Sequence, residues 1–350
     1  MKKVLYITNI ESPYRVKFFN LLAEQCDLTV LYEREKSANR NAAWAKSESN
    51  RHKMKYLGGI RIGNENAFTL RILKDIFAGY DAIIIGCYNS PVQMFAMLVM
   101  RLFGIKFVIN LDGEPFLEGS GLKTKLKRFF LSGAEKYLVA GEKAGESLRK
   151  GLENSDAIVY YFSSLTEQEL TEHRENAKNC VRNDTILVVG QYFDYKGMDV
   201  VLEAAQLDQT LQYKFVGMGS RTELFLKDYA SKIPPNVEII PFLQKAELEE
   251  EYKKCAMLVL PSRQECWGLV INEAASFGMP IVSTWGSGAA VEFLAEAYPQ
   301  YLAKSGDAEN LLKCIRECLE EGTQGYSAFL MEKSKDYSIE RSVQVHIDAL

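Results

Sequence analysis

The sequence predicts an α/β protein with two doubly wound parallel sheets. Short apolar strands alternate with helical segments along most of the chain, and this alternation is typical of parallel sheets covered by helices. A length of 350 residues suggests about two domains, and 47% apolar residues are enough for two hydrophobic cores. We therefore expect two Rossmann-like domains.

Five apolar segments predict the strands of the first domain, with a helix over residues 16–26 between the first two. The turn after the first strand, residues 9–15, contains no glycine. The glycine-rich fingerprint of NAD-binding proteins is missing at the place where it should occur, which argues against an NAD enzyme. The expected strands cover residues 2–8, 28–32, 82–86, 106–110 and 159–162.

Four strands of the second domain are followed by glycines or charged residues. Lys196 follows the first of these strands, Gly217 and Gly219 the second, Glu265 the third and Gly288 the fourth. The carboxyl ends of parallel strands meet at one edge of a sheet, where ligands bind. We therefore expect these residues to form one ligand site. The strands themselves are expected near residues 185–189, 213–216, 256–260 and 281–284.

Two carboxylates flank a glycine in the segment 261–273. Glu265 lies on the expected loop, whereas Glu273 lies in a helix over residues 268–277 that is apolar on nearly every side. A buried carboxylate without a partner costs several kcal/mol or becomes protonated. A ligand rich in hydroxyl groups would remove this conflict, and so would a buried Arg or Lys. The alternative is a carboxylate that complements the helix dipole and forms a structural ion pair.

Lys196 precedes Gly197 at the entrance of a helix. An ammonium group and free helix amides that point the same way can bind a phosphate. The alternative is a lysine that is solvated in a turn.

The order of these motifs resembles the nucleotide-sugar domain of the retaining glycosyltransferases of family four, which have the two-domain GT-B fold. The most specific part is the pattern Pro-Ser-x-x-Glu-x-x-Gly-Leu-x-x-x-Glu-Ala, which begins at Pro261. The resemblance implies two Rossmann-like domains that face a cleft. It also implies that Glu265 contacts the hydroxyl groups of the donor sugar, that Glu273 holds the ribose, and that Lys196 binds the diphosphate. Further donor-binding residues are then expected at Gly217, Gly219, Gly268, Leu269 and Gly288.

The chain departs from the family at Gln191, where many members carry an arginine after the glycine that corresponds to Gly190. This difference leaves Lys196 and the helix amides near Gly268 and Gly288 to carry more of the diphosphate charge.

Residues of the first domain are candidates for the acceptor side. The Pro-Tyr-Arg turn that contains Tyr14 and Arg15 resembles the opening of sugar transferases that act on lipid-linked or polymeric acceptors. Arg15 could contact an acceptor phosphate, or it could be a surface arginine. Asp112 occupies a position where many relatives carry a histidine, and is either a catalytic carboxylate or the turn-forming residue of Asp-Gly. None of the three histidines, His52, His173 and His346, lies in a promising sequence context.

The segment 122–131 is basic and amphipathic. It could rest on an anionic membrane surface near a lipid-linked acceptor, or it could be a domain helix with solvated lysines. The net charge of −4 argues against nucleic-acid binding. No signal peptide is evident, and the longest apolar stretch, residues 92–99, is too short to span a bilayer. Seven cysteines without metal-ligand spacing indicate free thiols in a reducing cytosol.

Composition places an acceptor-side domain at residues 1–165, a linker at 166–184 and a nucleotide-sugar domain at 185–336. A helix over 337–350 is expected to cross back to the first domain, as in GT-B enzymes. The expected function is retaining, metal-independent transfer from a nucleotide sugar such as a UDP-sugar, without a further cofactor. The expected acceptor is a saccharide or lipid-linked saccharide in cell-surface polysaccharide or glycolipid synthesis, in the cytoplasm or on the inner membrane face. The alternatives are a sugar-nucleotide epimerase of the same fold and a nucleotide-binding partner subunit without turnover.

Overall fold

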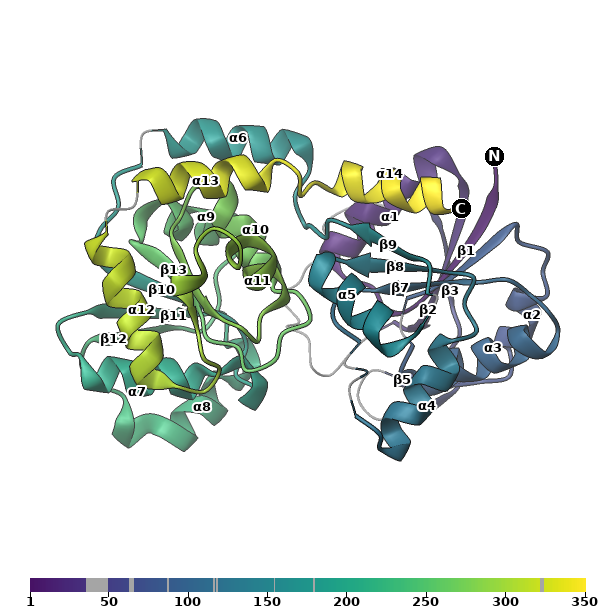
Figure 1. The fold of residues 1–350 in the computed structure, drawn as a ribbon, viewed down its shortest axis with the longest axis horizontal. Coiled ribbons are helices and arrows are strands. Elements are labelled where there is room, and N and C mark those ends of the chain that lie inside the picture. Colours follow the sequence, from purple (N-terminus) through teal and green to yellow (C-terminus); the bar gives the residue numbers. More distant parts are fainter. Residues whose placement is uncertain are drawn as a thin grey trace. The chain divides into compact units, whose positions relative to one another are not determined.

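The computed structural model describes residues 1–35, 50–62, 66–86, 88–115, 117, 119–153, 155–178, 180–321 and 324–350. These residues form two compact units (Figure 1). The first contains Met1–Ser164 together with Ile339–Leu350, and the second contains Leu165–Ser338.

The first unit is built around a seven-stranded parallel sheet with the order β3-β2-β1-β6-β7-β8-β9. The strand order reverses between β1 and β6. The strands are β1 (Lys3–Ile10), β2 (Asp27–Arg34), β3 (Lys53–Tyr56), β6 (Ala82–Ile85), β7 (Val108–Leu111), β8 (Lys136–Ala140) and β9 (Ala157–Tyr160), and a separate antiparallel pair is formed by β4 (Ile60–Ile62) and β5 (Asn66–Phe68). The helices are α1 (Pro13–Gln25), α2 (Ile72–Ile76), α3 (Pro91–Leu102), α4 (Leu122–Leu131), α5 (Glu142–Gly151) and α14 (Ile339–Ala349).

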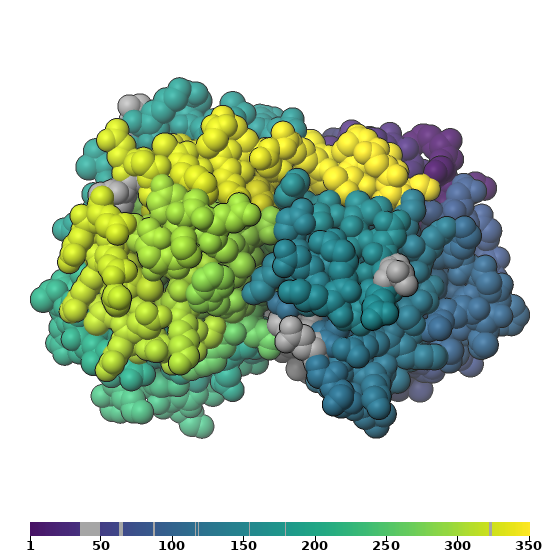
Figure 2. All heavy atoms as spheres, viewed as in Figure 1, coloured from purple at the N-terminus to yellow at the C-terminus, as the bar shows by residue number. Residues whose placement is uncertain are grey.

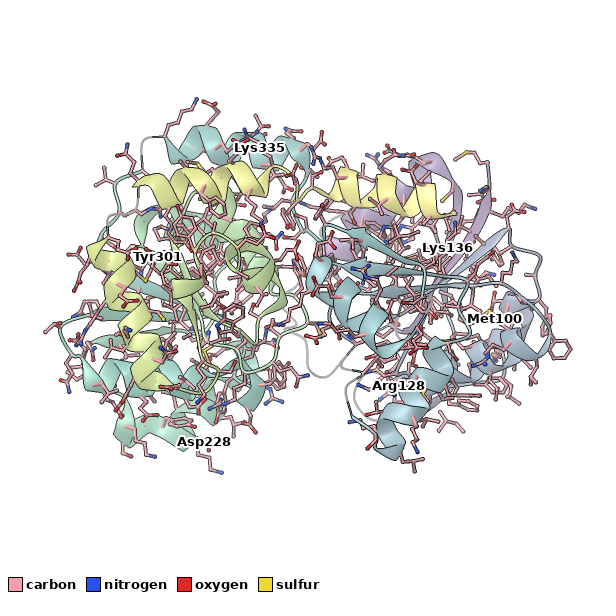
Figure 3. The ribbon with its side chains drawn as sticks, in the orientation of Figure 1. Met100, Arg128, Lys136, Asp228, Tyr301 and Lys335 are labelled. Carbon is pink, nitrogen blue, oxygen red and sulfur yellow. The ribbon has the colours of Figure 1, made fainter. Side chains whose placement is uncertain are left out.

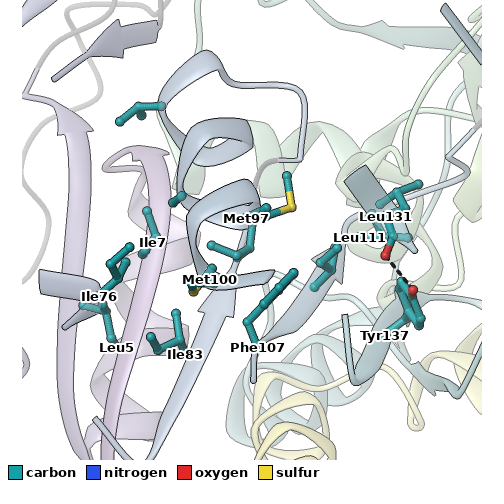
Figure 4. Close-up of a cluster of buried hydrophobic side chains, with 14 of the residues drawn as sticks. Leu5, Ile7, Ile76, Ile83, Met97, Met100, Phe107, Leu111, Leu131 and Tyr137 are labelled. Carbon is teal, nitrogen blue, oxygen red and sulfur yellow. Dashed lines mark hydrogen bonds between the residues drawn. The ribbon is translucent and has the colours of Figure 1, made fainter. Parts of the chain in front are cut away.

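Alternate residues of the central strand β1 serve the two faces of this sheet. Leu5 and Ile7 point into a buried cluster with side chains of α2, α3 and β6 (Figure 4). In the same cluster Tyr137 donates a hydrogen bond of 2.6 Å to the carbonyl oxygen of Leu131. Tyr6 points to the opposite face, where its ring packs edge-on against Phe19 of α1 at 4.8 Å. This period of two is what a strand buried on both faces requires.

Helix α14 completes the second face of the first sheet, because it packs against α1, β8 and β9. Lys136 of β8, which Figure 3 labels, donates a 2.8 Å hydrogen bond to the carbonyl oxygen of Ala349. Lys2 donates another of 2.8 Å to the carbonyl oxygen of Leu350. The outer side of α14 lies on the molecular surface (Figure 2).

The second unit contains a six-stranded parallel sheet with the order β12-β11-β10-β13-β14-β15. Its strand order reverses between β10 and β13. The strands are β10 (Thr185–Val189), β11 (Gln212–Val216), β12 (Val237–Ile240), β13 (Met257–Leu260), β14 (Ile281–Thr284) and β15 (Leu302–Ala303). The helices are α6 (Glu167–Ala177), α7 (Met198–Leu207), α8 (Thr222–Tyr229), α9 (Lys245–Lys254), α10 (Leu269–Ser276), α11 (Gly288–Leu294), α12 (Ala308–Glu320) and α13 (Gln324–Ser334).

The segment 166–184, expected to be a linker, is instead largely a packed part of the second unit. Helix α6 begins at a capping box in which Thr166 and Glu169 satisfy each other's backbone amides. The ring of His173 stacks on Phe277 at 4.0 Å. Arg182 donates to three carbonyl oxygens, including that of Phe277 at 2.9 Å. The polar composition of this segment thus reflects a surface helix and not a linker.

No helix in the described ranges is long and apolar enough to cross a membrane. Six cysteines in those ranges are free thiols. Cys87 lies outside the described residues.

Candidate active site

Lys196 and Glu265 meet at the reversal of strand order in the second unit. Lys196 ends a short 3-10 turn after β10, and Glu265 lies on the loop after β13. Their side chains form an ion pair, with exposed fractions of 20% and 14%. Such a reversal leaves a crevice at the carboxyl ends of the strands, where open α/β sheets bind ligands. The residues predicted to bind the diphosphate and the donor sugar are therefore neighbours at the expected edge of the sheet.

Gly197 explains how the two loops come so close. Its φ is +68°, and a Cβ atom there would lie 2.2 Å from the carbonyl oxygen of Pro261. Any other residue would be strained and would push the loops after β10 and β13 apart. The glycine beside Lys196 therefore has a structural function whether or not a phosphate binds there.

Backbone hydrogen bonds to the loop after β14 fix the position of Glu265. Its amide donates to the carbonyl oxygen of Gly286 at 2.8 Å, and its carbonyl oxygen accepts from the amide of Gly288 at 3.3 Å. The next amide, that of Ala289, donates to Trp267 at 2.8 Å. The amide of Gly288, expected to help bind the diphosphate, is therefore already used within the protein.

Glu273 has an internal partner. Its side chain is half-buried on α10 and accepts a hydrogen bond of 2.9 Å from the hydroxyl group of Tyr252. Burial first, and then the nearby charge of Glu273, raise the pKa of Tyr252 well above its ordinary value. The carboxylate of Glu273 therefore has a hydrogen-bond partner within the protein and does not require a ligand. Its contact with a ribose stays a prediction.

The other predicted donor-binding residues lie at the same edge of the sheet. Gly217 and Gly219 follow β11 with φ values of +92° and +55°, which favour glycine. Gly268, with φ of +101°, directly precedes α10, and Leu269 is the first residue of that helix. The loop after β13 and the start of α10 therefore place Glu265, Gly268 and Leu269 in one short segment.

In the first unit, Arg15 and Asp112 form an ion pair. The Arg15 side chain is only 7% exposed, whereas that of Asp112 is 29% exposed. Burial opposes the charge of Arg15, but Asp112 and neighbouring groups outweigh it and raise the pKa of the guanidinium further. Arg15 is therefore a buried and not a surface arginine, its guanidinium is directed at Asp112, and its contact with an acceptor phosphate stays a prediction. Tyr14 is half-buried and packs edge-on against Phe162 at 5.7 Å.

A network of buried polar groups surrounds Asp112. The amide nitrogen of Asn110 donates to Asp112 at 3.0 Å, and the hydroxyl group of Tyr160 donates to the same carboxylate oxygen at 2.8 Å. The amide oxygen of Asn110 lies 2.9 Å from the Tyr6 hydroxyl group and 2.7 Å from Nε2 of His346. Burial lowers the pKa of His346 to about 4, so the ring is neutral at pH 7. Helix α14 is thus linked to Asp112 through the ring of His346 and the side-chain amide of Asn110.

Comparison with known proteins identifies the family. A family model described as glycosyl transferases group 1 matches residues 169–337. An uncharacterized glycosyltransferase of Haemophilus influenzae is 30% identical over 276 residues, which cover 75% of this chain and 74% of the relative. The chain belongs to the group 1 glycosyltransferases. Another relative, an uncharacterized glycosyltransferase of Methanocaldococcus jannaschii, is 25% identical over 333 residues, covering 82% of this chain and 93% of the relative.

A solved structure shares the fold of this glycosyltransferase over its whole length. Anabaena HepE in complex with UDP and glucose aligns with a TM-score of 0.72 at 15% identity, with 100% of both chains covered. The GT-B fold with two parallel-sheet domains, predicted from the sequence, is confirmed.

Sequence reasoning missed His346 as a neighbour of the candidate site in the first unit of this glycosyltransferase. His346 and Asn110 are separated by 236 residues, and nothing near His346 in the sequence points to their contact. Among the described residues, no group of three or more His, Cys, Asp or Glu side chains is arranged to hold a metal ion.

Proposed function

We propose that this glycosyltransferase transfers a sugar from a UDP-sugar to a saccharide or lipid-linked saccharide, with retention at the anomeric carbon and without a bound metal ion or further cofactor. The observation that carries the proposal is the Lys196–Glu265 ion pair at the reversal of strand order. It offers a cation for the leaving diphosphate and a carboxylate for the hydroxyl groups of a sugar.

The chemistry follows from where charge develops. As the glycosidic bond breaks, negative charge grows on the diphosphate oxygen atoms, and a cation held beside them stabilises the transition state more than the ground state. Lys196 is suited to this function because its loop is fixed by the close approach of Gly197 to Pro261. Glu265 is suited to orient the sugar because its backbone is bonded on both sides to the loop after β14.

Donor binding must change the Lys196–Glu265 contact. In the structure, the charges of Lys196 and Glu265 neutralise each other. A diphosphate would draw Lys196 away, and the sugar hydroxyl groups would then satisfy Glu265 with hydrogen bonds to a charged acceptor. The pair therefore prevents either charge from being buried without a partner before the donor arrives.

UDP is the proposed nucleotide because solved structures of the same fold were obtained with UDP, with UDP and glucose, and with UDP-glucose. A carboxylate at Glu273, one turn after Leu269 on α10, is chemically suited to accept hydrogen bonds from two ribose hydroxyl groups. Its bond with Tyr252 would then orient the carboxylate and need not break, since a carboxylate can accept several hydrogen bonds.

An exposed face of the first unit supports a lipid-linked acceptor. Helix α4 exposes Leu122, Leu126 and Phe129 together with Lys123 and Lys125. On the adjoining helix α3 the Arg101 guanidinium lies 4.6 Å from the centre of the Phe129 ring, and Leu102 and the following Phe103 are exposed. Apolar side chains ringed by cations are suited to an anionic lipid surface. This face supports the proposal that the reaction occurs at the inner face of a membrane, in cell-surface polysaccharide or glycolipid synthesis.

Product analysis tests the proposal. The protein is first screened by thermal shift against UDP, GDP and ADP and their sugar conjugates, since a ligand at 100 times its dissociation constant stabilises by about 2.7 kcal/mol. Products formed from the stabilising donor are then identified. Transfer to an added acceptor with retained anomeric configuration and in the presence of a chelator supports the proposal. A rearranged sugar without transfer would indicate an epimerase, and binding without turnover would indicate a partner subunit.

A further inference from the structure

Three basic side chains lie on the loops that follow β10, β11 and β13 in the second unit. Lys196 is paired with Glu265. Arg263 is paired with Asp199 through two hydrogen bonds of 2.8 and 2.6 Å. Arg221 differs from both, because no carboxylate among the described residues lies within ion-pairing distance of it. It is the side chain whose positive charge is left uncompensated on these loops.

Contacts that leave its charge without a carboxylate partner among the described residues hold Arg221 in place. It ends the short turn Gly219–Arg221 after β11, and its Nη1 donates to the carbonyl oxygen of Tyr192 on the loop after β10 at 3.2 Å. Its guanidinium carbon lies 3.7 Å from the centre of the Phe193 ring. A cation stacked on an aromatic face keeps its N–H edge available, and arginine has five such donors.

The loop that receives Arg221 is itself fixed. Phe193 stacks on Tyr195 at 5.3 Å, and the hydroxyl group of Tyr192 donates to Asp228 at 2.9 Å. The backbone amide of Arg263 donates to the carbonyl oxygen of Tyr195 at 2.8 Å. The guanidinium of Arg221 is therefore held against the loop that carries Lys196, between the carboxyl ends of β11 and β10.

We infer that Arg221 binds the diphosphate of the nucleotide donor. This inference rests on the proposed function and adds to it a second cation, supplied by the loop after β11. Gln191, on the loop after β10, carries no charge, and the charge of Lys196 is partly neutralised by Glu265. A planar guanidinium held at its face and at one N–H can present the remaining donors to two phosphate oxygen atoms.

Calorimetry with UDP and with uridine tests this assignment. Arg221→Gln is expected to weaken UDP binding by roughly 10- to 100-fold, the range for hydrogen bonds to a charged group, and to leave uridine binding unchanged. The UDP affinity of Arg221→Lys should lie between those of the wild type and Arg221→Gln, because lysine keeps the positive charge but lacks the planar guanidinium. Lys227→Gln is the matched control, since it removes the same charge from an exposed position on α8.

The outcomes separate this inference from the proposed function. Wild-type affinity for UDP in a folded Arg221→Gln protein would overturn the assignment and leave the proposed function standing. An equal loss of UDP and uridine binding would also overturn it, because Arg221 would then only shape the loop. A wild-type protein that binds neither UDP, GDP nor ADP would overturn the proposed function and this inference with it.

Discussion

Replacement of Glu265 by Gln should have opposite effects on nucleotide binding and on sugar transfer. The carboxylate of Glu265 is the ion-pair partner of Lys196, with both side chains largely buried. A diphosphate must compete with this carboxylate for the ammonium group. Glu265→Gln removes the competing charge, so Lys196 becomes available to UDP.

The magnitude follows from the exposure of the pair. A hydrogen bond to a charged group contributes about 1.5–3 kcal/mol, which sets an upper limit on the competition. Partial solvation of both side chains and the hydrogen bond that glutamine can still accept reduce the free energy of this competition. We therefore expect Glu265→Gln to bind UDP roughly 2- to 10-fold more tightly than the wild type. Transfer should nevertheless fall by about 100-fold, a loss of roughly 2.7 kcal/mol in transition-state stabilisation, because the sugar has lost its carboxylate partner.

The assay combines calorimetry with UDP, melting temperature and initial rates of transfer, with Glu203→Gln as the control for charge at an exposed position on α7. Tighter UDP binding together with slower transfer supports the reasoning. A folded Glu265→Gln protein that transfers at the wild-type rate would refute the role of Glu265 in the reaction. Weaker UDP binding in that protein would refute the competition between carboxylate and diphosphate.

Three further predictions concern the leaving group, the membrane and pH. Lys196→Met should lower kcat more than it raises KM, because its charge acts on the breaking bond, and steady-state kinetics showing a change in KM alone would contradict this. Lys123→Gln with Lys125→Gln should release the protein from anionic vesicles in a sedimentation assay, since each cation contributes about 1 kcal/mol, and equal sedimentation with the wild type would favour a solvated helix. Burial lowers the pKa of His346 from 6.5 to about 4, so below pH 6.5 the unfolded chain binds a proton that the native protein does not. The free energy of unfolding should therefore have its full value above pH 6.5 and be about 2 kcal/mol lower at pH 5. Urea unfolding of wild type and His346→Gln at pH 7.5 and pH 5 measures this, and an identical fall in both proteins would exclude His346 as its source.

Local patterns were sufficient to predict β10, β11, β13 and β14 of the second unit, whereas β12 and β15 were not expected from the sequence. The apolar runs of β10 and β13 are visible in the sequence, and glycines and charges at the strand ends mark the ligand-binding edge. Helix α6 was also visible in principle, because Thr166 and Glu169 have the spacing of a capping box. Its polar composition suggested a linker instead, since a helix with one buried stripe is mostly polar.

Contacts between distant residues could not be predicted in the same way. Lys196 and Glu265 are 69 residues apart, and Arg15 and Asp112 are 97 residues apart. Their pairing depends on how each loop leaves its strand, which the side-chain pattern does not encode. The sequence also allowed Arg15 to lie at the surface, because the first turn of a helix can point to solvent or to the sheet. Only the fold shows that α1 directs Arg15 at Asp112.

The order in which the chain is made gives α14 a further consequence. The polypeptide leaves the first unit at Ser164 and returns to it at Ile339. A ribosome therefore releases β1 to β9 long before the helix that covers their second face exists. Until residues 339–350 have been synthesised, Phe18 lacks the ring of His346 that packs on it at 4.7 Å, and Asn110 lacks its hydrogen bond to the same ring. The first unit is thus the first to be synthesised and the last to be completed. Until then, the face of its sheet that α14 covers is exposed, and folding factors or other unfinished chains can bind to it.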